Sequence, residues 1–193
     1  NSIKDTGYEV ANSVRFDDGS SDSFNRTPSS AGSTRLATFS FWLKRGHFGI
    51  TPYVYMVSDG SNNQFGMHID SNDKLVCFHY NGSSYDFSLT STSQFRDPSA
   101  WYHFVIKIDT ANGTAIERLK LFVNGVYDPW NTTISQNFDG IWLKNSTAYI
   151  GSSTTPHAHY DGYFAEYVVI DGTALEPTSF GEYNEDSPTI WQP

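Results

Sequence analysis

The chain has 193 residues, enough for one β-domain of ordinary size, and it is rich in aromatic residues, with 14 Phe, 12 Tyr and 5 Trp. Aromatic residues favour strands, while the helix formers Ala and Leu are scarce, so a helix bundle, a coiled coil and a disordered acidic tail are excluded. The formal charge of −9, with no Lys/Arg cluster to offset it locally, argues against nucleic-acid binding.

Apolar and polar residues alternate through most of the chain, which predicts strands. The strands that this pattern predicts cover residues 38–44, 53–58, 64–69, 74–80, 85–89, 101–109, 118–123, 148–151 and 163–170. Two hairpin turns are marked by Asn-Gly pairs, at Asn81 and Gly82 and at Asn124 and Gly125. Strands that recur every 10–15 residues with turn signals between them predict an all-β antiparallel sandwich rather than βαβ units.

The end of the chain is less regular. Residues 174–180 have room for one short helical turn, because Pro177 blocks a longer helix. Residues 181–193 lose the alternation, and we expect a less regular C-terminal tail on a single domain that spans residues 1–193.

Cys77 is the one cysteine, and its apolar surroundings predict a small buried thiol. It has no partner for an intramolecular disulfide, which favours folding in a reducing cytosol. No apolar run approaches the roughly 18 residues of a membrane span, so membrane insertion is not expected. The chain starts at Asn1 without a Met or a signal peptide, and we expect it to be a processed product or a piece of a longer polypeptide.

Four segments, taken in order, resemble the laminin-G-like, concanavalin A-like jelly-roll family from about Ser13 to Gly181. They are WYHFVIKID (101–109), LKLFVNG (119–125), YIG (149–151) and DGYFAE (161–166). Three flanking segments are similar to the version of this domain in fibre and virion structural proteins of tailed phages, especially marine phages. These are VRFDDG (14–19), FNRTP (24–28) and IDGTALEPTSFG (170–181).

The resemblance implies a two-sheet antiparallel jelly-roll sandwich. It also implies a virion structural or adhesion domain, in a fibre, a tail or a capsid decoration, that folds in the host cytoplasm and is displayed on the particle. Its partners would be virion proteins and host surface glycans, and by analogy with fibres it would form a homotrimer. The alternative is a secreted or cell-surface carbohydrate-binding module. Five Asn-x-Ser/Thr triplets, at Asn25, Asn81, Asn112, Asn131 and Asn145, keep that extracellular alternative open.

The sequence offers no catalytic motif, and we expect no enzyme. Glucanases on this fold carry Glu-x-Asp-x-x-Glu on one strand, which is absent here, as is a nucleophile-elbow sequence. Glu166 and Asp171 are five apart and so fall on opposite strand faces. We expect Glu166 to share a face with Phe164, Val168 and Ile170, partly buried and held by hydrogen-bond donors.

Two metal sites are conceivable, although no cofactor is required by the sequence. His157 and His159, followed by Asp161, place two imidazoles on one side of an extended segment, where both reach one divalent metal. The resemblance also implies a Ca²⁺ site at a loop edge, for which the candidates by residue type are Asp17, Asp18, Asp59 and Asp161.

The family often binds glycans, and aromatic ring faces suit the CH-rich surfaces of sugars. Aromatic residues expected at loop tips are therefore the candidates for ligand binding. They are Tyr53, Tyr55, Tyr85, Trp130 and Tyr160.

Overall fold

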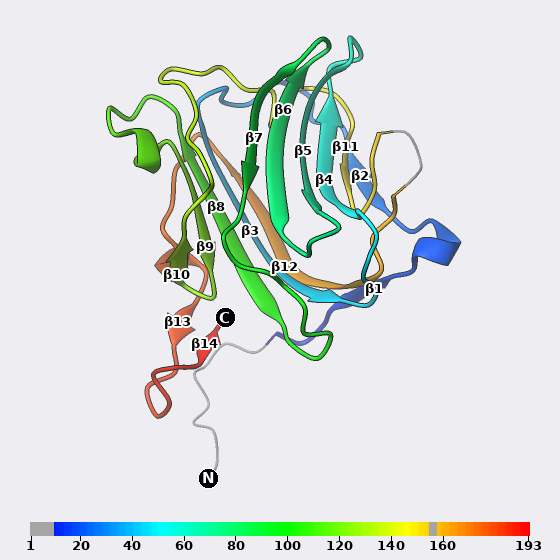
Figure 1. The fold of residues 1–193 in the computed structure, drawn as a ribbon, viewed down its shortest axis with the longest axis vertical. Coiled ribbons are helices and arrows are strands. Elements are labelled where there is room, and N and C mark those ends of the chain that lie inside the picture. The colour runs from blue at the N-terminus through cyan, green and yellow to red at the C-terminus, as the bar shows by residue number, and fades with distance from the viewer. Residues whose placement is uncertain (1–9, 155–157) are drawn as a thin grey trace.

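Two six-stranded antiparallel sheets stack face to face in the computed structural model, which describes residues 10–154 and 158–193 (Figure 1). Sheet A contains, in spatial order, β1 (Val14–Phe16), β12 (Gly162–Asp171), β3 (Leu36–Arg45), β8 (Tyr102–Asp109), β9 (Leu119–Val123) and β10 (Val126–Asp128). Sheet B contains β2 (Phe24–Arg26), β11 (Ala148–Ile150), β4 (Tyr53–Ser58), β5 (Asn63–Ile69), β6 (Leu75–Asn81) and β7 (Tyr85–Thr90). The predicted all-β antiparallel sandwich is confirmed.

Each strand predicted from alternation is present, with ends that agree to within two residues, and β4 has the predicted bounds. The short strands β1, β2, β10, β13 (Glu182–Tyr183) and β14 (Trp191–Gln192) were not predicted. Each has two or three residues, too few to show an alternating pattern.

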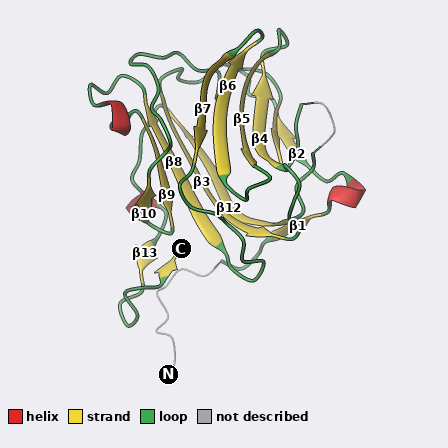
Figure 2. Cartoon of the chain, viewed as in Figure 1, coloured by secondary structure: helices red, strands yellow, loops and turns green. Residues whose placement is uncertain are grey.

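Helical structure is limited to three single 3₁₀ turns, η1 (Asp18–Ser20), η2 (Ala115–Glu117) and η3 (Pro177–Ser179), and Figure 2 shows how little of the described chain they occupy. η3 is the short turn predicted around Pro177. Within residues 10–154 and 158–193, no helix has the length and apolar character needed to cross a bilayer.

The inner faces of the two sheets form one aromatic core. The ring of Phe39 in sheet A lies 6.0 Å from that of Phe65 in sheet B, and Phe65 in turn contacts Trp142 at 5.7 Å. All three residues are fully buried, and the burial of a Phe side chain contributes roughly 1.5–3 kcal/mol. The high aromatic content of the sequence therefore serves first to fill the space between the sheets.

The hairpin turn between β9 and β10 confirms the prediction at Asn124 and Gly125. Both residues have positive φ, 49° and 78°, as a type I′ turn requires. The Asn124 side chain also accepts a hydrogen bond of 2.8 Å from the backbone N–H of His103 on β8. The turn thus fixes the end of three neighbouring strands.

A β-bulge interrupts β12 between Ala165 and Val168, and Glu166 within it has a φ of 46°. The extra residue reverses the alternation, so that Tyr167 and Val169 pack against the core. The expectation that Glu166 shares a partly buried face with Phe164 and Val168 is wrong: Glu166 is exposed.

The C-terminal segment crosses the outer face of sheet A instead of leaving the domain. The Thr38 hydroxyl donates to the carbonyl of Thr173 (2.7 Å) and accepts from the backbone N–H of Leu175 (2.8 Å). Farther along, β13 (Glu182–Tyr183) pairs with β14 (Trp191–Gln192), and Trp191 is buried against Trp42. Ser40, Trp42 and His103, on the outer face of sheet A, are buried in consequence.

Candidate functional site

Aromatic rings form a continuous row on the outer face of sheet B. The Tyr53 ring lies 5.5 Å from that of His68, His68 lies 5.7 Å from Phe78, and Phe78 lies 5.7 Å from Tyr85. The row continues to Tyr80, 5.3 Å from Tyr85. We call these five residues, from β4, β5, β6 and β7, the aromatic platform. Two of its members, Tyr53 and Tyr85, are ligand-binding candidates from the sequence.

Two β-bulges put Tyr53 and Tyr85 of the platform on the outer face of sheet B. The register shift between Tyr53 and Tyr55 sends Tyr53 outward and Tyr55 inward. The shift opposite His79 and Tyr80 separates Tyr85, which is 63% exposed, from Phe87, which is in the core. Without these bulges each pair would share a face.

The middle of the platform rests on Gly66. A Cβ atom at this position would lie 2.8 Å from both the Phe78 ring and the Met56 sulfur. The missing side chain lets the Phe78 ring settle onto the sheet, where it is 4% exposed and supports its neighbours.

The platform is uncharged at neutral pH. Burial raises the pKa of Tyr53, and the nearby Tyr85 adds to this shift. Burial lowers the pKa of His68 to about 4, although Asp70 acts in the opposite direction. The ring planes are tilted by 55–82° to their neighbours, so each ring offers its own face, and uncharged ring faces suit contact with the apolar faces of sugars.

The other three aromatic candidates do not belong to the platform. Tyr55 is 5% exposed and donates its hydroxyl to the carbonyl of Trp142 (2.8 Å), and Tyr160 is fully buried and donates to the carbonyl of Lys44 (2.8 Å). Tyr160 is enclosed in the core and is not at a loop tip, so that expectation is wrong. Tyr55 lines a separate cavity of about 370 Å³ together with Phe24 and Tyr167, and its role in ligand binding stays a prediction. Trp130 is half-buried, packs against the core and bridges to Ser91, beyond the end of β7 opposite to Tyr85.

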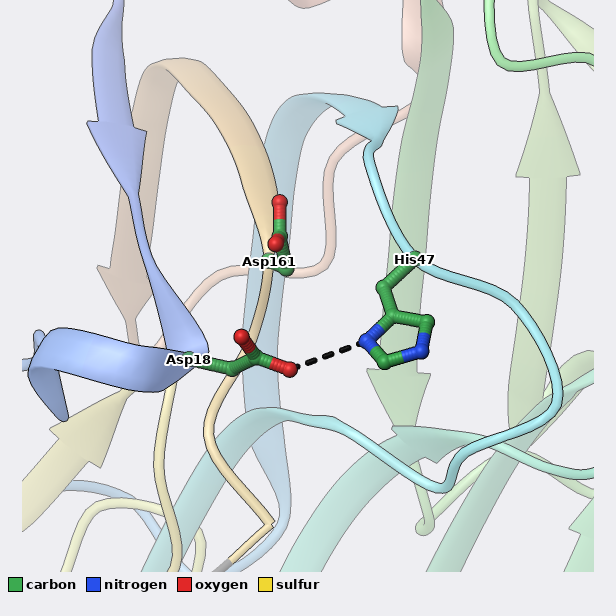
Figure 3. Close-up of side chains that lie close together, drawn as sticks. All are labelled: Asp18, His47 and Asp161. Carbon is green, nitrogen blue, oxygen red and sulfur yellow. Dashed lines mark hydrogen bonds and ion pairs between the residues drawn. The ribbon is translucent and has the colours of Figure 1, made fainter.

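A second cluster lies where three loops meet at the end of the sandwich. Ligand atoms of Asp18, His47 and Asp161 all lie within 4.8 Å of one another (Figure 3). The His47 ring already contacts the Asp18 carboxylate, Nδ1 to Oδ2, at 2.9 Å. Two of these residues were Ca²⁺ candidates from the sequence, whereas His47 was not predicted at all.

The backbone around the cluster is held closely in place. Gly46 donates its backbone N–H to the carbonyl of Asp161 (2.9 Å), and a Cβ atom on Gly46 would collide with the Asp161 carboxylate. Gly162 has a φ of 139°, and its Cβ position lies 2.1 Å from the carbonyl oxygen of Lys44. Both glycines therefore allow the loop before β12 to approach the end of β3.

Arg45 anchors the His47 loop from below. Its guanidinium is buried, donates to Asp73 (2.6 Å) and to the carbonyl of Phe95 (2.9 Å), and reaches the carbonyl of His47 at 3.1 Å. The backbone that carries His47 is thus attached to the rest of the sandwich by a charged group.

The remaining predicted metal ligands have other places. Asp17 accepts hydrogen bonds from Gly19 and caps η1, and Asp59 holds its own turn by accepting from the N–H of Ser61. His157 lies outside the described residues. His159 is buried and is not a member of the Asp18, His47 and Asp161 cluster, so the predicted pair of imidazoles on one metal stays a prediction.

Ser40 and His103 also contact each other on the outer face of sheet A, but the direction of their hydrogen bond does not suit nucleophilic catalysis. Trp191 donates its indole N–H to His103 Nδ1 (2.8 Å), so the proton of the neutral ring is on Nε2, 2.9 Å from the Ser40 hydroxyl. His103 therefore donates to Ser40 and is not the base that would remove its proton. Burial lowers the pKa of His103 to about 4, which keeps the ring neutral.

The described strands and their order define a jelly-roll sandwich with ligand candidates on one outer face and at one end. The chain belongs to the concanavalin A-like lectin/glucanases superfamily, whose laminin G-type family model matches residues 18–179. The resemblance noted in the sequence is confirmed at the level of the family. A search of curated proteins found no match.

Several solved structures share the fold at low sequence identity. The CBM40 domain of the Ruminococcus gnavus IT-sialidase has a TM-score of 0.58 and 14% identity, covering 81% of this chain and 95% of that one. The SAP-like pentraxin of Limulus polyphemus, a heptamer, has a TM-score of 0.57 and 17% identity, covering 80% and 72%. Domain 4 of the arabinanase AbnA from Geobacillus stearothermophilus, in complex with arabinotriose, has a TM-score of 0.56 and 16% identity, covering 76% and 65%.

Proposed function

We propose that this domain binds glycans without catalysing a reaction and that the aromatic platform on sheet B contacts the sugar. The observation that carries this proposal is the neutral row of rings from Tyr53 to Tyr85, with Tyr85 63% exposed at its edge. Exposed tyrosines offer a rigid apolar face and a hydroxyl that exchanges hydrogen bonds with sugar hydroxyls.

Structures with the same fold support this proposal. The CBM40 domain of the Ruminococcus gnavus sialidase was solved bound to α2,3- and α2,6-sialyllactose, and the AbnA domain was solved with arabinotriose. On sheet A, His103 donates its hydrogen bond to Ser40 instead of accepting one, which supports a domain that binds without catalysing a reaction.

The Asp18, His47 and Asp161 cluster would hold a divalent cation beside the platform. The loop before Asp161 is tied to the start of β4, because the backbone N–H of Tyr53 donates to the carbonyl of Ala158 (3.1 Å). Two carboxylates with one imidazole suit Zn²⁺ or Mn²⁺ better than Ca²⁺, which prefers oxygen ligands. A bound cation would lock the three loops together and offer a Lewis-acidic position to a sugar hydroxyl.

The biological setting is also a proposal. The segments at 14–19, 24–28 and 170–181 support display on a tailed-phage particle, as a fibre, tail or decoration domain that contacts virion proteins and host glycans, with a trimer as the default assembly. The alternative, an extracellular carbohydrate-binding module, is supported by the sugar-bound neighbours. Mass spectrometry of purified virions discriminates the two, because only the first places this chain in the particle.

A glycan array followed by calorimetry of the strongest hit tests the binding function. Replacement of Tyr85 by Ala is expected to weaken binding about tenfold, which corresponds to the loss of about 1.4 kcal/mol of stacking. Tyr127→Ala is the matched control, since Tyr127 is a 37% exposed tyrosine on sheet A. An array without hits, or equal losses for both variants, would reject the platform.

A further inference from the structure

A cavity of about 360 Å³ opens on the outer face of sheet A, on the opposite side of the sandwich from the platform. Residues 10–13, just before β1, form one wall and residues 191–193 form another, while Trp42 and Ala165 from the sheet line the space between them. Its volume falls within the range of small-ligand pockets, roughly 300–1,000 Å³.

Three of the five tryptophans of the chain, Trp42, Trp101 and Trp191, line this cavity. Two of them are held rigidly by the same histidine. The His103 ring stacks on Trp42 (4.8 Å between centroids, 15° between planes) and on Trp191 (6.0 Å, 16°), which also donates its indole N–H to it. Indoles fixed before binding lose little conformational entropy when a ligand packs against them.

The polar groups of the cavity lining are incompletely satisfied. The indole N–H of Trp42 and the side-chain NH₂ of Gln192 are buried without a hydrogen-bond partner in the described structure. Both are donors that lie beneath the cavity surface, with less than 1 Å² of exposed area each, so they reach a ligand oxygen only after a small shift of their side chains. None of the lining residues has a charged side chain, and the net charge of −9 repels anions.

The floor of the cavity lies beside the bulge in β12. Ala165 pairs with Trp42 in the register of the sheet, and its small side chain leaves the space above the indole open. The next residue, Glu166, has a left-handed backbone conformation that is unfavourable for a residue with a Cβ atom. Glu166 itself lines a neighbouring cavity, together with Ser40 and His103.

We propose that this tryptophan cavity is a second carbohydrate site, specific for a neutral pyranose. The tryptophan side chains of the lining contact the CH face of the ring, and the uncharged lining suits a neutral sugar. The tryptophan cavity is separate from the platform on sheet B and does not depend on the cation cluster. Sugar binding at the cavity and sugar binding at the platform can therefore be refuted independently.

The test uses the whole 193-residue chain and a panel of methyl β-glucoside, methyl β-galactoside and N-acetylglucosamine, with sialic acid as the charged comparison. Two-dimensional NMR of the wild-type protein follows the indole N–H signals during titration. At least one neutral sugar is expected to shift the signals of Trp42, Trp101 and Trp191 with a Kd of about 1 mM, and sialic acid is expected to leave them in place. Unchanged indole signals for the whole neutral panel overturn the proposal.

Variants then assign the binding to this cavity. Ala165→Leu fills the cavity without removing a ring, and Trp101→Ala removes a half-buried wall; each is expected to weaken sugar binding at least tenfold. Tyr85→Ala, which damages only the platform, is expected to leave these indole shifts unchanged. If Ala165→Leu folds with the wild-type spectrum elsewhere and still binds equally well, the sugar is not in this cavity.

Discussion

The replacement of Arg45 by Met tests how the sandwich supports the loop that carries His47. Arg45 is 2% exposed, and its guanidinium is bound by Asp73, by two backbone carbonyls and by the ring of Phe48, 4.2 Å away. Met is unbranched and apolar but ends where the Nε atom of Arg lies, so the variant keeps the packing of the stem, removes the charge and the donors, and leaves the space of the guanidinium unfilled.

The structure indicates a large loss of stability. Breaking one partner of a buried ion pair costs about 3–5 kcal/mol, because the other charge is left buried. Asp73 would keep Arg96, but that side chain is 58% exposed and compensates only weakly. At about 2–4 °C per kcal/mol for a domain of this size, Tm should fall by roughly 6–20 °C.

Urea and thermal unfolding of Arg45→Met, Asp73→Asn and the double variant give the interaction energy as a double-mutant cycle. The double variant is expected to be more stable than the sum of the single losses implies. A loss below about 1 kcal/mol for Arg45→Met, or strict additivity, would refute the assignment of a buried, coupled pair.

The same pair predicts a pH dependence. Burial alone would raise the pKa of Asp73, but hydrogen bonds from Arg45 and Arg96 outweigh it and hold the pKa below the ordinary value of 3.8. Because the folded pKa is the lower one, the stabilisation is complete above pH 3.8 and is lost as the pH falls through the folded value. Asp73→Asn should remove this acid-dependent loss, which unfolding at pH 5 and pH 2.5 measures.

Four further outcomes are expected. Burial lowers the pKa of His103 in the folded protein to about 4, while the unfolded value is 6.5, so between these pH values the unfolded chain binds one proton more. The free energy of unfolding should therefore fall by up to about 3 kcal/mol from pH 6.5 to pH 4. Urea unfolding should show a smaller fall for His103→Gln. Burial raises the pKa of the Cys77 thiol, so a thiol reagent should modify it only after denaturation; rapid reaction of the native protein would contradict its position. Gly162→Ala should lower Tm by more than 5 °C, since a Cβ there meets the Lys44 carbonyl at 2.1 Å, while Gly113→Ala, in open space, is the control. Asp161→Asn should reduce Zn²⁺ affinity at least tenfold by calorimetry and Asp59→Asn should not; equal affinities would reject the cation cluster.

Alternation was sufficient to predict the long strands because each of them has one face in a single aromatic core. The rings of Phe39 and Phe41 on β3 are fully buried, and Ser40 between them lies on the outer face of the sheet. A strand of three residues, such as β1, is too short for the alternation of apolar and polar residues to be recognised in the sequence.

The positions of Tyr55 and Glu166 differ from those expected for one reason. A β-bulge adds a residue to one strand and exchanges the two faces beyond it, and nothing in the local sequence marks the addition. Tyr55 follows the bulge in β4 and turns into the core, whereas Glu166 lies within the bulge in β12 and is exposed.

The cation cluster was only partly predictable. Asp18 and Asp161 are common residue types in loops and were selected by type, but His47 lies in a loop that contains no metal-binding motif. The three meet because β1, β3 and β12 are neighbours in sheet A and the loops around their ends converge. That order of strands is a property of the whole sandwich and cannot be derived from the spacing of residues 18, 47 and 161.

The two proposed sugar sites lie on opposite outer faces, with both sheets between them. Stacked sheets are about 10 Å apart, so ligands on the two sides face away from each other. One domain therefore cannot place both sites on a single flat glycan layer, and avidity for one surface would have to come from several copies of the chain. With both proposed sites occupied, a single copy would act as a cross-linker, joining one glycan chain to another or a surface on one side to a sugar on the other.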